Sequence, residues 1–183
     1  MTQGIGGEPT NQVRRLVAAQ PHGSGARKAI YPLESIATFW VDELLLGIEI
    51  EHVQEVLRGQ EVSPVPLSDP AILGLLNLRG RLVAAVELRH RLGLVARPID
   101  VPAVHVVIHT SGEPVSLVVD REGEVAQVDD RSEPVPETVS PAIAAFLTGV
   151  HQLDGSLLLL LDAARAVELS AHGKEVAHAG PGH

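Results

Sequence analysis

The chain has 183 residues, of which 45% are hydrophobic and 20% charged, and its formal net charge is −9. A chain of this length can bury a substantial core, and that core has to be aliphatic because only four residues are aromatic. The absence of cysteine excludes disulfides, thiolate chemistry and cysteine-based zinc sites, and the acidic balance disfavours nucleic acid as the main partner.

Residues 1–33 are rich in glycine, proline and polar residues and have a net charge of +3, which leaves −12 for residues 34–183. This composition predicts a flexible N-terminal extension, with a short docking helix around residues 13–19 as the alternative. Residues 171–183 predict a flexible C-terminal tail in the same way. Neither a signal peptide nor a membrane span is expected, because apolar runs such as residues 157–161 are far shorter than the roughly 20 residues that cross a bilayer.

Between the tails the hydrophobic pattern mostly has a period of two, which is typical of β-strands. In "VHVVIHT" the aliphatic Val104, Val106 and Ile108 share one face. His105 and His109 lie on the other face, about 13 Å apart along a strand, which is too far to hold one metal ion. We expect both histidines to face solvent. Many short strands separated by turn signals favour a sandwich or barrel.

Helical signals are few. The segment "SPAIAAFLTG" at residues 140–149 has an N-cap Ser140, a proline at the first helical position and Gly149 after its end, which together predict one helix. Short helical stretches are also expected at residues 87–94 and 162–169. The pair Asp154-Gly155 indicates a two-residue hairpin turn.

An internal repeat is the strongest feature of the sequence. The stretch "GLLNLRGRLVAAVELR" at residues 74–89 recurs in degenerate form as "GVHQLDGSLLLLLDAA" at residues 149–164. The offset between matched positions grows from 69 to 75 along the chain, as small loop insertions would produce. The repeat predicts two copies, at about residues 36–94 and 103–169, each an all-β unit of about five strands that buries an aliphatic face against the other.

The two copies differ at the turn of the repeated hairpin. Asp154 suits a tight turn, since aspartate tolerates left-handed backbone angles. Arg79, at the equivalent position, gains nothing from such a turn. A binding partner for its planar, charged side chain is therefore the interpretation we favour, and a solvated surface arginine is the alternative.

At this point the motifs resemble those of the CheW family, the coupling proteins of bacterial chemosensory arrays. The family pattern "GVxNLRGxVVPVxDLR" corresponds to residues 74–89, and its "VxEV", "VVD" and "LLD" segments to residues 53–56, 118–120 and 160–162. Order and spacing agree over about 135 residues. Two positions depart from the pattern: Ala84 stands in place of a proline, which frees a backbone N–H, and Glu87 replaces an aspartate.

The resemblance implies an all-β fold of two SH3-like five-stranded barrels related by pseudo-twofold symmetry, with a few short helices, in a domain spanning residues 34–170. It implies a non-enzymatic, cytoplasmic adaptor that couples the tips of methyl-accepting chemoreceptors to a CheA-type histidine kinase at receptor arrays, with no cofactor or metal. By this analogy the partner-binding residues are Val53, Glu55, Gly74, Leu75, Asn77, Leu78, Arg79 and Gly80.

Roles within that set are not uniform. We expect Arg79 to contact a carboxylate or a helix C-terminus of a partner. Gly74 and Gly80 are interpreted as structural, because a hairpin rim needs backbone freedom. Val53 and Leu75 fit a binding groove and a core equally well. Asp120 and Asp162, which end equivalent strands, are interpreted as turn or capping groups.

Other functions have less support. The sequence contains no nucleophile elbow, phosphate-binding loop or zinc-protease helix, so no enzyme is expected. A binder of proline-rich peptide would need more aromatic residues than this chain has. A CheW-like scaffold of a pathway other than chemotaxis stays open as an alternative, as does an SH3-like peptide-binding module.

Overall fold

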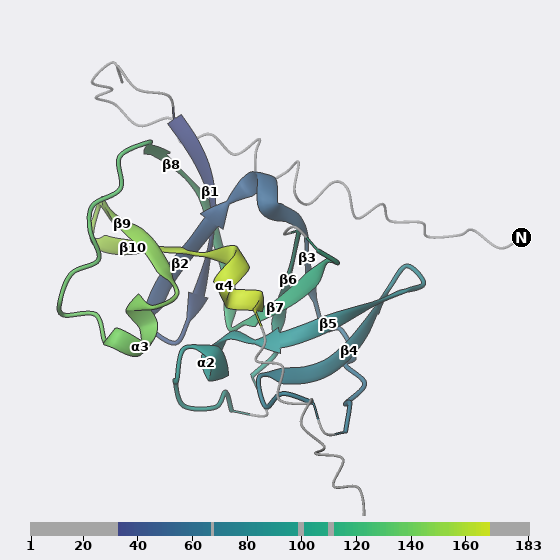
Figure 1. Ribbon diagram of the computed structural model, residues 1–183. Helices are drawn as coiled ribbons and strands as arrows, with labels where there is room; N and C mark the ends of the chain where they lie inside the picture. The colour runs from purple at the N-terminus through teal and green to yellow at the C-terminus, as the bar shows by residue number, and fades with distance from the viewer. Residues whose placement is uncertain (1–32, 67, 99–100, 110–111, 169–183) are drawn as a thin grey trace, which may run out of the picture.

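The computed structural model describes residues 33–66, 68–98, 101–109 and 112–168, which form strands and a few short helices (Figure 1). The strands are β1 (Leu33–Val41), β2 (Leu44–Glu49), β3 (Val53–Arg58), β4 (Ile72–Leu78), β5 (Arg81–Glu87), β6 (Val104–Ile108), β7 (Val115–Val119), β8 (Arg121–Asp129), β9 (Leu147–Leu153) and β10 (Ser156–Leu161). The helices are η1 (Ile50–His52), α2 (Leu88–Arg91), α3 (Pro141–Ala144) and α4 (Ala163–Val167).

Two segments treated in the sequence analysis lie almost wholly outside the described residues. They are the N-terminal extension of residues 1–33, which includes the possible helix at residues 13–19, and the C-terminal tail of residues 171–183.

The strands form two five-stranded sheets, which confirms the expected all-β fold. The first sheet has the order β8-β1-β2-β10-β9 and the second the order β3-β6-β7-β5-β4. Most neighbours are antiparallel, but β10 runs parallel to β2, and β5 runs parallel to β7. Figure 1 shows the two sheets as separate groups, with the β4–β5 hairpin extending away from the rest of the molecule.

The two sheets do not follow the two halves of the sequence. Each half contributes five strands, as the repeat predicts, but β8, β9 and β10 of the second half join β1 and β2 of the first. In return β3, β4 and β5 join β6 and β7. The expectation that each copy forms a unit of its own is therefore wrong: the copies exchange three strands.

The exchange preserves the pseudo-twofold symmetry. Each strand of the first sheet has its counterpart five strands further along the chain, with β1 taken to follow β10, and the counterparts have the same order in the second sheet. Even the isolated bridges match, since Ser63 pairs with Leu75 and Glu133 pairs with Val150. Each bridge connects the segment that follows one edge strand to the opposite edge strand, and thereby helps to close the sheet into a barrel.

Three aliphatic clusters hold this arrangement together. The largest lies between the sheets and draws residues from both of them, including Phe39, Leu46, Leu117 and Leu159. A second cluster fills the second sheet's other face, and a third does the same for the first sheet. Because the largest cluster needs both sheets, neither barrel has a complete core without the other.

Two sequence expectations about local structure are corrected. His105 does not face solvent: it is 1% exposed, because β6 is an interior strand that is buried on both faces. The helix expected at residues 140–149 is only α3, which starts after the N-cap Ser140 as predicted but ends at Ala144. Gly149 lies in β9 instead, where a Cβ would overlap the side chain of Ser132.

Candidate partner-binding site

The eight residues predicted to bind partners lie on the two edge strands of the second sheet and on the turn that follows β4. Val53 and Glu55 belong to β3, and residues 74–78 belong to β4. Arg79 and Gly80 form the two-residue turn between β4 and β5, since Leu78 is paired with Arg81. Edge strands can leave backbone groups unpaired, and the bridge between Ser63 and Leu75 pairs only part of the β4 edge.

The turn holds Arg79 in a conformation that arginine rarely adopts. Its φ is 52°, in the left-handed region, and that of Gly80 is 86°. Among non-glycine residues of the described chain, only Asp42 shares a positive φ with Arg79, so Asp154 in the equivalent turn does not adopt it. A left-handed residue costs about 1–2 kcal/mol. Turn geometry thus disfavours arginine at this position, which strengthens the argument that its side chain serves another purpose.

Asn77 stabilises the turn from the side. Its Oδ1 accepts a hydrogen bond from the backbone N–H of Gly80 at 2.8 Å. Asparagine commonly bonds to a backbone group a few residues ahead, and such bonds favour tight turns. Asn77 is itself exposed, so it can also meet a partner.

An ion pair connects the turn to the other edge strand. Arg79 Nη2 lies 3.2 Å from Glu55 Oε2. The Glu55 side chain is 6% exposed and that of Arg79 is 58% exposed. The buried carboxylate therefore fixes one end of the guanidinium, while most of the side chain stays in solvent. An arginine held in this way presents its remaining donors with less loss of conformational freedom on binding.

The face of the hairpin that points away from the inner cluster carries aliphatic side chains and an amide. Asn77 is directly opposite Leu82, and Leu75 is opposite Ala84, so these four share one face. Leu82 is 70% exposed, whereas Leu75 and Ala84 are half-buried. We call these four residues and Arg79 the hairpin face. It combines a positive charge, an amide and aliphatic surface, the combination expected for a protein partner.

The remaining predicted residues are buried or confined by backbone contacts, or belong to the turn. Leu78 is 9% exposed and belongs to the cluster inside the second sheet. Gly74 has a φ of 150° and lies against the Ser63 carbonyl, where a Cβ would overlap the oxygen. Val53, at the start of β3, is half-buried and packs on the core between the sheets. Leu78 and Gly74 thus lie on the inner side of β4, Val53 packs on the core between the sheets, and Gly80 provides the second left-handed position of the turn.

Sequence reasoning missed a buried ion network at the end of β5. The Arg89 Nε lies 3.0 Å from both Asp120 carboxylate oxygens, and its Nη2 lies 3.1 Å from Asp42 Oδ1. Burial alone would raise the pKa of Asp120, but hydrogen bonds from Arg89 and from the Asp42 backbone outweigh it, so this pKa lies below its usual value. The two motifs "ELR" and "VVD" contain these charges, but nothing in their spacing indicates that Arg89 and Asp120 meet, and Asp120 was interpreted as a turn or capping group.

A second buried pair was missed as well. Arg97 Nη2 lies 3.0 Å from Glu87 Oε2, and both side chains are almost buried. Burial raises the pKa of Glu87, against the opposing charge of Arg97. At the surface, Glu49, Glu51 and His52 place potential metal ligands within 4.8 Å of one another. They sit at η1, away from the hairpin face.

Comparison with known proteins identifies the family of this chain. A family model described as a CheW-like domain matches residues 35–170. The chain belongs to the CheW-like family. The chemotaxis protein CheW of Rhizobium meliloti is 28% identical over 128 residues, which cover 69% of this chain and 83% of that protein. The probable chemotaxis protein CheW of Rhizobium etli is 30% identical over 130 residues, with coverage of 69% and 83%.

A solved structure agrees with the sequence relatives. The crystal structure of the scaffolding protein TtCheW from Thermoanaerobacter tengcongensis matches with a TM-score of 0.64 and 26% identity, over 71% of this chain and 89% of that one. The CheW-like fold predicted from the sequence is thereby confirmed. Within the described residues, no helix is long and apolar enough to cross a bilayer.

Proposed function

We propose that this CheW-like chain is a non-enzymatic scaffold that holds a CheA-type histidine kinase next to the cytoplasmic tips of chemoreceptors. The hairpin face is the contact for one of these partners, and residues 34–170 act as one unit in the assembly. The protein reaches receptor arrays through its partners. The family match, the CheW relatives and the likeness to a scaffolding protein support this proposal.

The single observation that carries the proposal is the geometry of Arg79. A charged side chain on a left-handed turn is fixed at one end by buried Glu55 and is 58% exposed, so a partner can reach its remaining donors. A partner carboxylate or helix C-terminus would complete its hydrogen bonds. Repeated contacts within an array would then raise the effective concentration, so each single contact can be weak.

The alternative of an SH3-like peptide binder finds less support, because such binders use exposed aromatic grooves. Phe39 is 1% exposed. Trp40 is covered by the Arg121 guanidinium, 4.3 Å from the ring centre, and Phe146 by that of Arg91 at 4.9 Å. The described aromatic residues are therefore engaged within the chain.

The test is binding of the whole chain to the kinase and to the receptor tip of the same cell, measured by calorimetric titration. Arg79→Ala should weaken binding to one partner by about 1–3 kcal/mol, roughly 5- to 150-fold. Arg79→Lys keeps a charge beside Glu55 but loses the planar fork, so it should retain the fold and still weaken binding.

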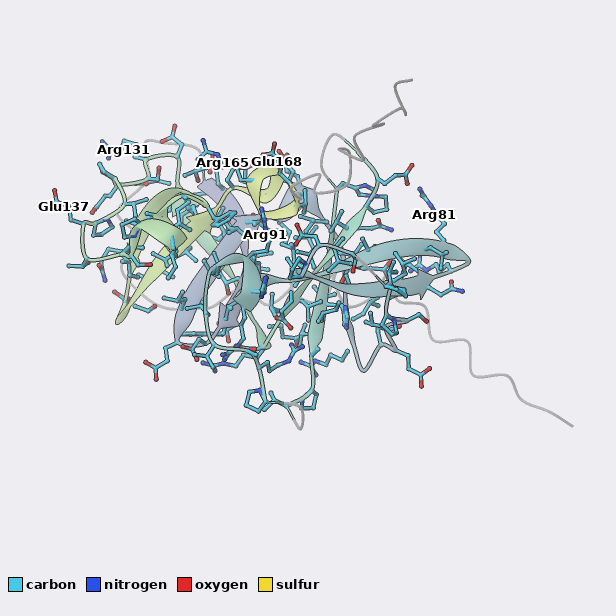
Figure 2. The ribbon with its side chains drawn as sticks, turned by 60° about the horizontal axis from the view of Figure 1, so that its bottom comes forward. Arg81, Arg91, Arg131, Glu137, Arg165 and Glu168 are labelled. Carbon is cyan, nitrogen blue, oxygen red and sulfur yellow. The ribbon has the colours of Figure 1, made fainter. Side chains whose placement is uncertain are left out.

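Arg81→Ala is the matched control. Arg81 lies at the outer end of the same hairpin (Figure 2) and pairs with Glu113 at 2.8 Å, but both side chains are largely exposed, 65% and 87%. Its replacement should change affinity for either partner by less than about 0.5 kcal/mol. Equal affinities for the wild type and both Arg79 variants would refute the role of the hairpin face. If the chain instead binds a kinase from a pathway other than chemotaxis, the proposed scaffold role would stand, and the proposed pathway would be wrong.

A further inference from the structure

The pseudosymmetry places a cleft at equivalent positions of the two barrels, beside the carboxylate that ends β5 or β10. The first cleft, of about 690 Å³, is lined by Glu87, Leu73 and Ala103 among others. The second, of about 250 Å³, has Asp162, Thr148 and Glu34 at the matching positions. The first cleft is thus larger and has apolar residues where the second has polar ones.

The two carboxylates are used differently. Asp162 caps α4: its Oδ1 accepts a hydrogen bond from the Arg165 backbone N–H at 3.1 Å, and its Oδ2 lies 3.2 Å from Arg165 Nε. Glu87 precedes α2 at the equivalent position but makes no capping bond. The additional methylene of glutamate carries the carboxylate past the helix end, to the wall of the cleft.

One oxygen of Glu87 is left with no donor. Oε2 is bonded to Arg97, whose Nη1 is directed to the Val119 carbonyl at 3.3 Å. Oε1 is buried, and no described residue meets the distance and angle of a hydrogen bond to it, although the backbone N–H of Arg89 lies near enough to the carboxylate to lower its pKa. Glu87 as a whole is 8% exposed. A buried acceptor without a donor costs about 1–3 kcal/mol, and more when it is charged, so a molecule that donates to Oε1 would gain this energy on binding.

The surroundings define the chemistry of that molecule. Leu73, Leu94, Pro70 and Pro102 form apolar walls. A cation would meet the Arg97 charge, and an anion would meet the free oxygen of Glu87. Since the Glu87–Arg97 pair is neutral as a whole, a neutral donor on an apolar body fits both parts of the cleft.

We propose that the Glu87 cleft is a binding site for a neutral small molecule that directs an amide N–H or a hydroxyl at Glu87 Oε1 and packs an aliphatic group against Leu73 and Leu94. The site is separate from the hairpin face. It does not depend on the scaffold function, and its test needs neither kinase nor receptor.

The experiment is a titration of the full chain, methyl-labelled at leucine and valine, followed by NMR. The probe is N-acetyl-leucinamide, and the matched probe is N-acetyl-leucine, in which a carboxylate replaces the primary amide. We expect saturable shifts of the Leu73 and Leu94 methyl groups with the amide, and at least fivefold weaker binding of the carboxylate. Methyl groups beside the second cleft, such as those of Leu160, should not move.

Two variants introduce residues of the second cleft at the equivalent positions of the first. Glu87→Asp withdraws the carboxylate toward the end of α2, and Leu73→Thr removes an apolar wall without touching Glu87. Each should weaken amide binding at least fivefold, whereas Asp162→Asn, in the other barrel, should leave it unchanged. Leu73 is 38% exposed, so Leu73→Thr is expected to fold even if Glu87→Asp does not.

Three results would overturn the proposal. One is the absence of saturable shifts up to the solubility limit of the amide. Another is equal or tighter binding of the carboxylate, which would indicate an anion site at Arg97. The third is unchanged affinity in both cleft variants.

Discussion

At the scale of single residues, the two barrels fill one pair of equivalent buried positions with different side chains. Ile36 is buried in the first sheet, and Gly47 leaves room for it, since a Cβ there would overlap the isoleucine side chain. The equivalent residues of the second sheet, 69 positions later, are His105 and Ser116. They are also buried, and His105 Nδ1 lies 3.0 Å from Ser116 Oγ. A large apolar residue with a glycine is thus replaced by a hydrogen-bonded polar pair.

This equivalence predicts a compensated exchange. His105→Ile alone should destabilise the protein by about 1–3 kcal/mol, because Ser116 is left buried without a partner and the isoleucine is crowded. Ser116→Gly alone should cost a similar amount. The double variant rebuilds the pair of the first sheet and should recover at least half of the summed loss. Urea denaturation of the four proteins measures the coupling, and strictly additive losses would contradict it.

The same double variant should change the acid stability. Burial lowers the pKa of His105 below its usual value, and the charge of Arg97 lowers it further. The folded protein then binds a proton at this imidazole more weakly than does the unfolded chain, in which its pKa is about 6.5. Stability should therefore fall as the pH drops through about 6.5 in the wild type. The double variant lacks this histidine, so its stability should fall less over the same pH range.

Sequence reasoning identified Arg79 as an unusual turn residue but failed with His105, for a physical reason. A turn position has local rules, so an arginine where aspartate or glycine is favoured can be recognised from the sequence alone. Whether a histidine on an alternating strand faces solvent depends on what covers that face. Val107, on the same face of β6 as His105, belongs to the buried cluster inside the second sheet. Alternation identifies a strand but does not distinguish an edge strand from an interior one.

At the scale of elements, the short helices α2 and α4 follow strands β5 and β10 and also connect the two barrels. Arg91, at the end of α2, donates to the carbonyls of Arg165, Ala166 and Glu168 at 2.7–3.1 Å, around the last turn of α4. Figure 2 shows Arg91 beside Arg165 and Glu168. Cations stabilise a helix C-terminus, where carbonyls lack partners within the helix. Each barrel thus contributes one helix to this contact.

Arg91→Ala should reduce the free energy of unfolding by about 1–2 kcal/mol, because it removes the donors of the α4 carbonyls and the contact with Phe146. The free energy of the local opening that permits amide hydrogen exchange in α4 should fall by a similar amount. Exchange in β6 should instead report global unfolding. Arg81→Ala is again the suitable control. An unchanged exchange rate in α4 would show that the helix does not depend on this contact.

The element boundaries expected from the sequence were only partly correct. The capping signals of α3 located its start, but Gly149 was assigned to the helix end although it belongs to β9. Glycine follows many helices, and it is also required where two backbones approach closely. At Gly149 the neighbouring Ser132 decides between these roles, and it is not a neighbour in sequence.

At the scale of the whole molecule, the repeat predicted the symmetry but not the exchange of strands. A repeat identifies which segments are equivalent, and this equivalence is the same whether strands pair within a copy or between copies. The pairing is decided by the connections: β3 leaves β2 through η1 and pairs with β6 instead of returning to the first sheet. That route is a property of the folded chain and leaves no periodic signal.

The exchange predicts that neither half folds alone. Expressed as two chains divided after Pro98, each half should have little β-structure by circular dichroism, because each would lack its partner strands and half of the largest core cluster. An equimolar mixture should recover part of the native spectrum. A stable, cooperatively unfolding single half would contradict the structural role given to the exchange.

The parallel pairing of β2 with β10 also constrains how the protein is made. Leu45 and its partner Leu158 are 113 residues apart. During translation β1 and β2 are made before β10. The edge of β2 that pairs with β10 therefore stays unpaired until almost all of the described chain has been translated. At about 5–20 residues per second, that delay is several seconds. The nascent hairpin therefore has an unpaired edge until β10 has been translated and can pair with β2.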